Sequence, residues 1–188
     1  MAITLVALAD PFAPLNAPAP IMAGPRTSHA PARIFSRTIR TSADFAGGGA
    51  RQIGSLINVA TPLSYGQSAW SDSKSFSGPV WIQIDLGRQI LSVFRGYDEI
   101  GTSVILYGAD RKPTPRGAFH ILEMSRNHRS SLYDAAMPYS LRLTGDGVAI
   151  HGSYVRENAA THGCIGVPTE FSKRLFSVAH IGDLVSIN

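Results

Sequence analysis

The sequence predicts a mainly β protein with one supporting helix near its C-terminus. The chain of 188 residues contains 18 glycines and 12 prolines, which place turns at short intervals. Between these turns, short apolar segments alternate with polar residues, as they do in half-buried strands. A helical stripe stands near the end of the chain, where Phe171, Leu175 and Val178 or Ala179 recur at helical spacing.

The composition narrows the class of protein. Apolar residues make up 44% of the chain and charged residues 16%, which suits a packed core rather than a disordered chain. The net charge of +4 favours anionic partners. Because Lys and Arg are scattered and no basic run is interleaved with aromatic residues, we expect no nucleic-acid partner. No run approaches the roughly 18 apolar residues of a membrane-spanning helix, so we expect no transmembrane segment.

The chain divides by composition into three parts. Residues 1–50 combine an apolar start with a Pro/Gly-rich arm, which cannot propagate a helix or a central strand. The start, Met1–Ala9, ends in an Ala-x-Ala tripeptide but lacks a positive n-region, so it is either a signal remnant or a plain apolar terminus. Residues 51–78 form a poorly defined connecting segment, in which the Ser/Gly-rich run 64–78 reads as loop. Residues 79–188 carry the regular pattern and form the predicted domain.

Residues 79–188 predict a meander of short strands, then a helix and a last strand. Val80, Ile82 and Ile84 share one face of the first segment, which is the alternation of a half-buried strand. Residues 125–137 are polar and predict a connection. Thr169 is the expected N-cap of the helix. The strands are expected at 80–85, 90–94, 102–107, 118–122, 139–143, 148–150 and 184–187.

The only cysteine, Cys164, lies in the segment Thr161-His162-Gly163-Cys164. A thiol attacks carbonyl carbon as a thiolate, so it needs a group that takes its proton. His162 is close in sequence, but neighbours on an extended segment can point away from each other. His151 ends a predicted strand and can face the sulfur across a cleft, which makes it the better candidate for the base. The backbone N–H groups of Gly163 and Cys164 are candidates for an oxyanion hole.

Two other interpretations of the cysteine remain open on the residues alone. A lone cysteine is often a small buried hydrophobe. A His-x-Cys pair with a further histidine can also bind zinc, but no fourth ligand is apparent nearby, so we expect neither a metal nor a cofactor. Trp70 and Trp81 are interpreted as packing residues. The histidines without a partner pattern are interpreted as surface or structural residues: His29, His120, His128 and His180.

The segment Ile150-His151-Gly152, followed by Ala160-Thr161-His162-Gly163-Cys164-Ile165, resembles the signature of the L,D-transpeptidases, the YkuD-type catalytic domain. The turn at 114–117 and the strand pair leading to the first histidine resemble the same family, and the similarity covers about residues 79–188. One position departs from the pattern, because Gly166 stands where the family usually has Arg or Asn. Arg142 and Arg156 are the candidates to substitute for that polar group.

The resemblance implies a YkuD-like β-sandwich that acts on peptidoglycan stem peptides outside the cytoplasmic membrane. It therefore implies an exported protein of the periplasm or cell envelope, and we expect a monomer. In the family's reaction a thiolate attacks the third residue of a donor stem tetrapeptide, D-alanine leaves, and the amine of a second stem closes a cross-link.

The resemblance also assigns roles to residues of this chain. Cys164 is the expected nucleophile and His151 the expected general base, with the carbonyl of Gly152 orienting the imidazole. Thr161 and His162 are expected to shape the pocket. Two alternatives stay open, namely a peptidoglycan hydrolase or amidase in which water replaces the acceptor amine, and a cell-wall-binding module with reduced activity, which the glycine after the motif favours.

Overall fold

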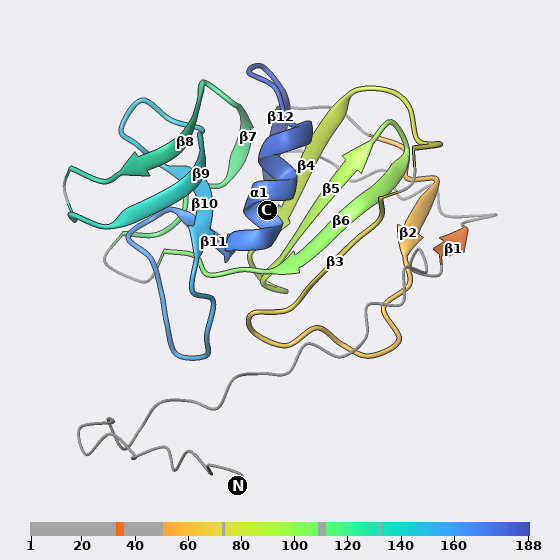
Figure 1. Ribbon diagram of the computed structural model, residues 1–188, viewed down its shortest axis with the longest axis horizontal. Coiled ribbons are helices and arrows are strands. Elements are labelled where there is room, and N and C mark those ends of the chain that lie inside the picture. The colour runs from red at the N-terminus through yellow and green to blue at the C-terminus, as the bar shows by residue number, and fades with distance from the viewer. Residues whose placement is uncertain (1–32, 36–50, 73, 109–111, 132) are drawn as a thin grey trace, which may run out of the picture.

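The computed structural model describes residues 33–35, 51–72, 74–108, 112–131 and 133–188, and of 33–35 only the backbone. The expected signal remnant and Pro/Gly-rich arm otherwise lie outside the described residues. The mainly β prediction is confirmed, since the described chain forms two sheets with one α-helix near the C-terminus (Figure 1). The elements are β1 (Arg33–Phe35), β2 (Ser55–Ile57), β3 (Ser68–Trp70), β4 (Val80–Asp85), β5 (Ile90–Arg95), β6 (Asp98–Val104), β7 (Gly117–His120), β8 (Glu123–Arg129), β9 (Ala136–Arg142), β10 (Ala149–Ser153), β11 (Ile165–Pro168), α1 (Thr169–Val178) and β12 (Leu184–Ile187).

The larger sheet is built around the predicted meander. Its order is β1-β2-β6-β5-β4-β12-β7, with β3 also paired to β6. Ile82 and Ile84 are fully buried on the side of the main core, and Trp81 is buried on the other side, where it stacks on Phe94 with ring centroids 4.0 Å apart. β4 is therefore a central strand buried on both faces, and β12 pairs parallel beside it as the predicted last strand.

The smaller sheet has the order β11-β10-β9-β8, and α1 packs against β9, β10 and β11 while also reaching β6 (Figure 1). The predicted helical stripe is the buried face of α1, because Phe171 is 1% and Leu175 0% exposed. The helix begins one residue earlier than expected. Pro168 is its N-cap and makes no side-chain cap bond, so Thr169 is the first helical residue rather than the cap.

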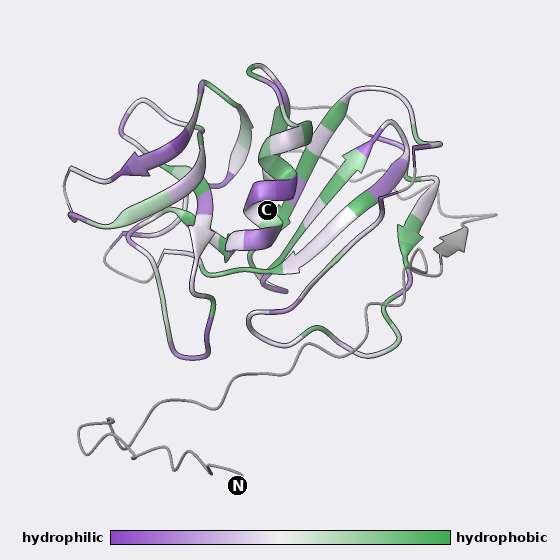
Figure 2. Cartoon of the chain, in the orientation of Figure 1, coloured by the Kyte–Doolittle hydropathy of each residue, from purple (hydrophilic) through white to green (hydrophobic). Residues whose placement is uncertain are grey.

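The polar connection predicted at 125–137 is wrong. Residues Glu123–Arg129 form β8, which pairs antiparallel with β9. β8 is an edge strand with mostly exposed side chains, and it is the strongly hydrophilic strand at the left of Figure 2. An edge strand exposed on both faces carries no apolar alternation, so the pattern that predicts strands is absent from it.

The segment 51–78 contributes two strands that its composition does not predict. Part of the run read as loop is β3, which pairs antiparallel with β6. Trp70 in β3 confirms its expected packing role. Its ring lies 2.3 Å from where a Cβ would stand on Gly101 and meets the ring of Phe171 edge-on at 5.3 Å. Gly101 in β6 thus leaves room for the indole of Trp70. The strands β2 and β3 were not predicted because three residues are too few to show the apolar alternation of a strand.

Candidate active site

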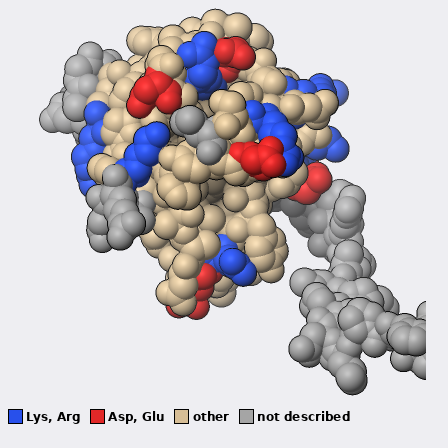
Figure 3. Space-filling view, turned by 90° about the vertical axis from the view of Figure 1, so that its left-hand side faces the viewer, with Lys and Arg blue, Asp and Glu red and all other residues tan. Residues whose placement is uncertain are grey.

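A cavity of about 440 Å³ opens between the β8–β9 hairpin, the β9–β10 turn and the segment that precedes β11. Cys164, His151, Thr161, His162 and Arg142 all line it, so the structure brings together most of the residues singled out from the sequence. On the face of the molecule seen in Figure 3, basic and acidic side chains are interspersed rather than sorted into stripes. The cavity walls have the same mixed character, with Lys112, Arg142, Glu123 and Asp146 all present.

The strand register fixes the level of the cysteine relative to the histidine. β10 and β11 are parallel, with Ile150 opposite Ile165 and His151 opposite Gly166. Cys164 directly precedes β11, so it lies at the level of Ala149, two residues before His151 on the neighbouring strand. His151 stands in the middle of β10 and not at a strand end as predicted, because β10 continues to Ser153.

Thr114 secures the loop that carries the cysteine. Its hydroxyl accepts a hydrogen bond from the Gly108 N–H at 2.9 Å and donates one to the Gly163 carbonyl at 3.0 Å. The side chain is only 5% exposed, so this hydroxyl satisfies two buried backbone groups. The N–H of Thr161 also donates to the Tyr107 carbonyl at 3.0 Å. The loop is therefore tied to the segment after β6 on both sides of His162.

The environment of the thiol disfavours its anionic form. Burial raises the pKa of Cys164, and the nearby Asp146 carboxylate raises it further, whereas the backbone of Ala149 and the ammonium of Lys112 lower it. The sulfur lies 3.7 Å from the Gly147 carbonyl, which a protonated thiol can approach as a weak donor. The resting group is therefore a thiol, and it reacts only if a base takes its proton.

His151 is held as a neutral imidazole. Nδ1 lies 3.0 Å from the carbonyl oxygen of Gly152. A carbonyl only accepts, so Nδ1 carries the proton and Nε2 is left as an acceptor. Burial lowers the pKa of His151, the bond to Gly152 raises it, and the nearby His128 lowers it. The contact expected from the Gly152 carbonyl is therefore present, and the second nitrogen is available to accept a proton.

The other expected residues divide into those inside and those outside the cavity. The Thr161 hydroxyl donates to the Cys164 carbonyl, and the exposed His162 ring stacks on Tyr133 with centroids 4.2 Å apart. Arg142 lines the cavity and is paired with Glu123 at 2.9 Å. Arg156 instead stands over the ring of Tyr154, 6.0 Å from its centroid, and does not line the cavity.

Gly166 has a structural reason to lack a side chain. A Cβ there would stand 3.0 Å from the Cβ of Ser153 and 3.5 Å from that of Leu106. The backbones of Leu106 and Gly166 exchange two hydrogen bonds at 2.8 and 2.9 Å. The glycine thus permits the two sheets to approach where the family usually carries Arg or Asn.

His128 is a cavity residue that sequence reasoning did not single out. It is exposed, as expected of a surface histidine, but its side chain also lines the cavity and lowers the pKa of His151. Tyr133 also lines the cavity and was not singled out. Both lie on or beside β8, which has no apolar period, so no sequence signal assigned them a facing direction.

Within the ranges that the structure describes, no group of three or more His, Cys, Asp or Glu side chains is arranged to hold a metal ion. In the same ranges, no helix is long and apolar enough to cross a membrane.

Comparison with known proteins places this fold in a family. The profile of the YkuD family, described as the L,D-transpeptidase catalytic domain, matches residues 79–187. No curated protein matches the chain significantly.

Among solved structures, an L,D-transpeptidase of Stackebrandtia nassauensis is 24% identical, with a TM-score of 0.55 over 63% of this chain and 58% of that one. One from Mycobacterium tuberculosis H37Rv is 22% identical, with a TM-score of 0.54 over 58% and 57%. A further L,D-transpeptidase, solved in complex with imipenem, is 22% identical, with a TM-score of 0.53 over 58% of each chain.

This chain spans less than two thirds of the length of these relatives, and the likeness in each case is one of fold. The family profile, by contrast, matches more than half of the chain and includes both cavity histidines of the motif and the cysteine. The chain belongs to the YkuD family of L,D-transpeptidase catalytic domains.

Proposed function

We propose that the chain is a peptidoglycan L,D-transpeptidase in which Cys164 is the nucleophile and His151 the general base. The observation that carries the proposal is the neutral imidazole. His151 Nδ1 is hydrogen-bonded to the Gly152 carbonyl, and the imidazole lines the same cavity as the Cys164 thiol, which burial keeps protonated. A neutral thiol beside a neutral base suits acyl transfer, since the proton moves only as the sulfur attacks.

The first half-reaction releases D-alanine. His151 Nε2 takes the thiol proton while the sulfur bonds to the carbonyl carbon of the third residue of the donor stem. The C–N bond to the terminal D-alanine then breaks, and the imidazolium returns the proton to the leaving amine. The product is a thioester on Cys164. In the second half-reaction the amine of another stem attacks this thioester, His151 accepts the proton of the attacking amine, and the thiol is restored with the cross-link formed.

The developing oxyanion needs donors that are already in place. Gly163 has a φ of 101°, a conformation open to glycine and strained for other residues. Its carbonyl is occupied by Thr114, and the carbonyl of Cys164 is occupied by Thr161. The Thr114 bond fixes the peptide plane that carries the Cys164 N–H, and the Thr161 bond fixes the next plane. The Cys164 N–H is therefore the preorganised donor proposed for the oxyanion, and the Gly163 N–H is proposed as the second donor.

The charged residues of the cavity suit a peptide that carries carboxylates. Lys112 and Arg142 both line the cavity, and Arg142 is partly neutralised by Glu123. We assign them to carboxylates of the stem peptide, where each partly exposed pair contributes about 0.2–1 kcal/mol. Because the substrate is peptidoglycan, the proposal includes export to the periplasm or cell envelope.

The decisive experiment measures D-alanine release from a donor tetrapeptide stem, with and without an acceptor amine. Wild type should release D-alanine and form the cross-linked product, and Cys164→Ala should do neither. Ser131→Ala, which alters an exposed hydroxyl of the same cavity, is the matched control and should remain active. Release that needs no acceptor would identify the hydrolase instead. Binding of the stem without any release would identify the binding module.

A second experiment uses imipenem, which one structural relative was solved with. We expect the β-lactam carbonyl to acylate Cys164, so that the intact mass rises by one drug adduct in wild type and is unchanged in Cys164→Ala. An unmodified wild-type mass after prolonged excess would contradict an activated thiol.

A further inference from the structure

The two halves of the β8–β9 hairpin present opposite faces of the ladder to the cavity. In the inner half, Ser125 and Ser140 are directly opposed and both line the cavity. In the outer half, His128 and Met137 are directly opposed and also line it. In a regular antiparallel ladder opposed residues share a face and successive pairs alternate, so pairs three positions apart lie on opposite faces. The hairpin must therefore turn over between these two pairs.

Tyr139 lies where the hairpin turns over. Its φ is +55°, in the left-handed region. A bulky residue is an outlier there, whereas asparagine and aspartate enter it more readily. The register confirms an interruption at this point, because Ser125 pairs with Ser140 and Asn127 with Pro138 while the pair between them is missing. The backbone of Tyr139 thus reverses the alternation of the strand.

Contacts on the side of α1 hold this conformation. Ser172 is a buried residue, 1% exposed, and its hydroxyl donates a hydrogen bond to the Tyr139 carbonyl at 3.1 Å. The Arg126 guanidinium stands 5.7 Å from the ring centroids of both Tyr139 and Phe176. The two rings meet edge-on at 5.8 Å. Helix α1 therefore contacts Tyr139, the residue at which the hairpin turns over, through both Ser172 and Phe176.

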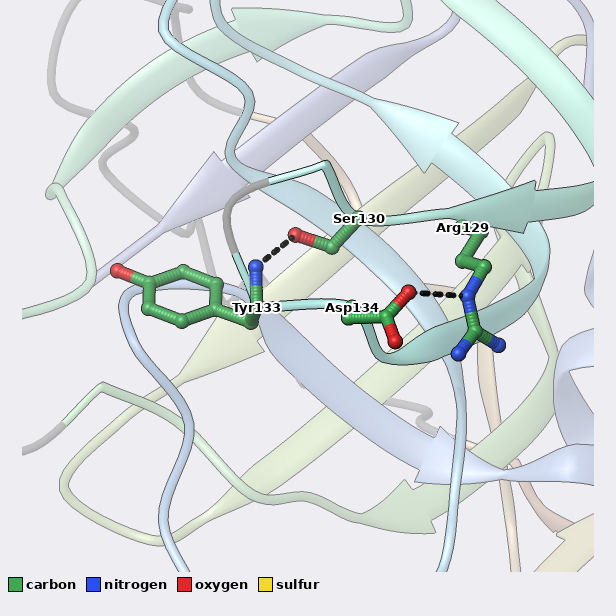
Figure 4. Close-up of polar contacts among 4 residues, drawn as sticks. All are labelled: Arg129, Ser130, Tyr133 and Asp134. Carbon is green, nitrogen blue, oxygen red and sulfur yellow. Dashed lines mark hydrogen bonds and ion pairs between the residues drawn. The ribbon is translucent and has the colours of Figure 1, made fainter.

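The outer half of the hairpin is closed at its tip, as Figure 4 shows. Arg129 pairs with Asp134 at 2.6 Å, and the N–H of Tyr133 donates to the Ser130 hydroxyl at 3.3 Å. Ser130 and Tyr133 line the cavity together with His128 and Met137. A reversal at Tyr139 therefore orients one connected wall rather than a single side chain.

We propose that Tyr139 is a positioning residue, whose left-handed backbone turns the outer half of the hairpin so that His128 and Met137 face the reactive cysteine. With regular alternation, Asn127 and Pro138 would occupy that wall instead. The consequence for binding the stem peptide rests on the proposed function, but the orientation of the wall does not. His128 provides an independent readout, because in the present orientation its charge depresses the pKa of His151.

The test compares Tyr139→Gly with Tyr139→Val. Both variants lose the ring, but glycine adopts a positive φ freely and a β-branched residue does not. The glycine variant should keep the KM for a donor tetrapeptide within about threefold, whereas the valine variant should raise it or lower kcat/KM by about 10- to 100-fold, the size expected for a displaced binding wall. Equal loss in both variants would show that the ring matters and would overturn the proposal. If the valine variant does not fold, Tyr139→Ala takes its place with the same expected direction.

A second measurement needs no turnover, so it separates this proposal from the function. His128→Gln is introduced into wild type and into each Tyr139 variant, and the pKa of His151 is measured by NMR titration. Removing His128 should raise the pKa of His151 in wild type and in Tyr139→Gly, but leave it unchanged in Tyr139→Val, where His128 faces away. The same rise in the valine variant would overturn the proposal. If wild type is inactive on every stem while this pattern holds, the function fails and the positioning role stands.

Discussion

Thr114→Val tests how strongly the cysteine loop depends on one hydroxyl. Valine has nearly the shape of threonine, so the change removes the bonds to Gly108 N–H and to the Gly163 carbonyl without opening a cavity. The site is 5% exposed, and both backbone groups are left without a partner. Each unsatisfied buried group costs about 1–3 kcal/mol, so we expect a loss near 3 kcal/mol in the free energy of unfolding. For a domain of this size, that is a fall in Tm of about 10 °C.

The assay combines urea unfolding with the rate at which imipenem acylates Cys164. Thr114→Ser is the matched control, because it keeps the hydroxyl and deletes only a methyl group, at a cost of about 1 kcal/mol. Thr114→Val should be the less stable variant and the slower to acylate, since the Gly163 peptide is no longer fixed. Equal stability and equal acylation rates in the two variants would refute the role given to this hydroxyl.

Three further predictions concern other parts of the site and core. The acylation rate of Cys164 should rise with pH through a midpoint below about 6.5, since burial lowers the pKa of His151 and only the neutral imidazole accepts a proton; a midpoint above pH 7 in a rate–pH profile would contradict this. Gly166→Ala should destabilise the fold by about 1–3 kcal/mol in urea unfolding because its Cβ meets Ser153, and the added change Ser153→Gly should recover part of that loss. Leu175→Ala should lower the free energy of unfolding by about 2–5 kcal/mol, because this side chain is fully buried between α1 and both sheets; a loss below 1 kcal/mol would contradict that packing.

The sequence was informative where burial imposes a period. Val80, Ile82 and Ile84 recur at period two because that face of β4 meets the main core, and Leu184, Val185 and Ile187 are apolar because β12 is buried throughout. His151 and Cys164 were singled out because a cysteine and a histidine on another strand can form a nucleophile and its base, and because the segments that carry them resemble the family signature. Both kinds of feature, the periodic pattern and the residue type, can be recognised in the sequence without knowledge of the fold.

The features that could not be predicted depend on contacts with residues far away in the sequence, which local periodicity does not reveal. β8 is polar because it is an edge strand, so His128 could not be assigned to the cavity. The family resemblance marks Gly166 as a departure but gives no reason for it, and the reason is the approach of Ser153 and Leu106 from other segments. The left-handed conformation of Tyr139 is equally invisible, because tyrosine is a poor sequence signal for positive φ.

The claim that His151 is the base for Cys164 is tested most directly by the pH profile of acylation in His151→Gln. Intact-mass kinetics with a donor stem or imipenem would be recorded from pH 5 to 10 for wild type and variant. We expect the variant to be about 10²- to 10⁴-fold slower at pH 7. Its rate should rise steadily toward high pH, because burial raises the pKa of the unassisted thiol. A variant that acylates at the wild-type rate with the wild-type profile would contradict the assignment of His151.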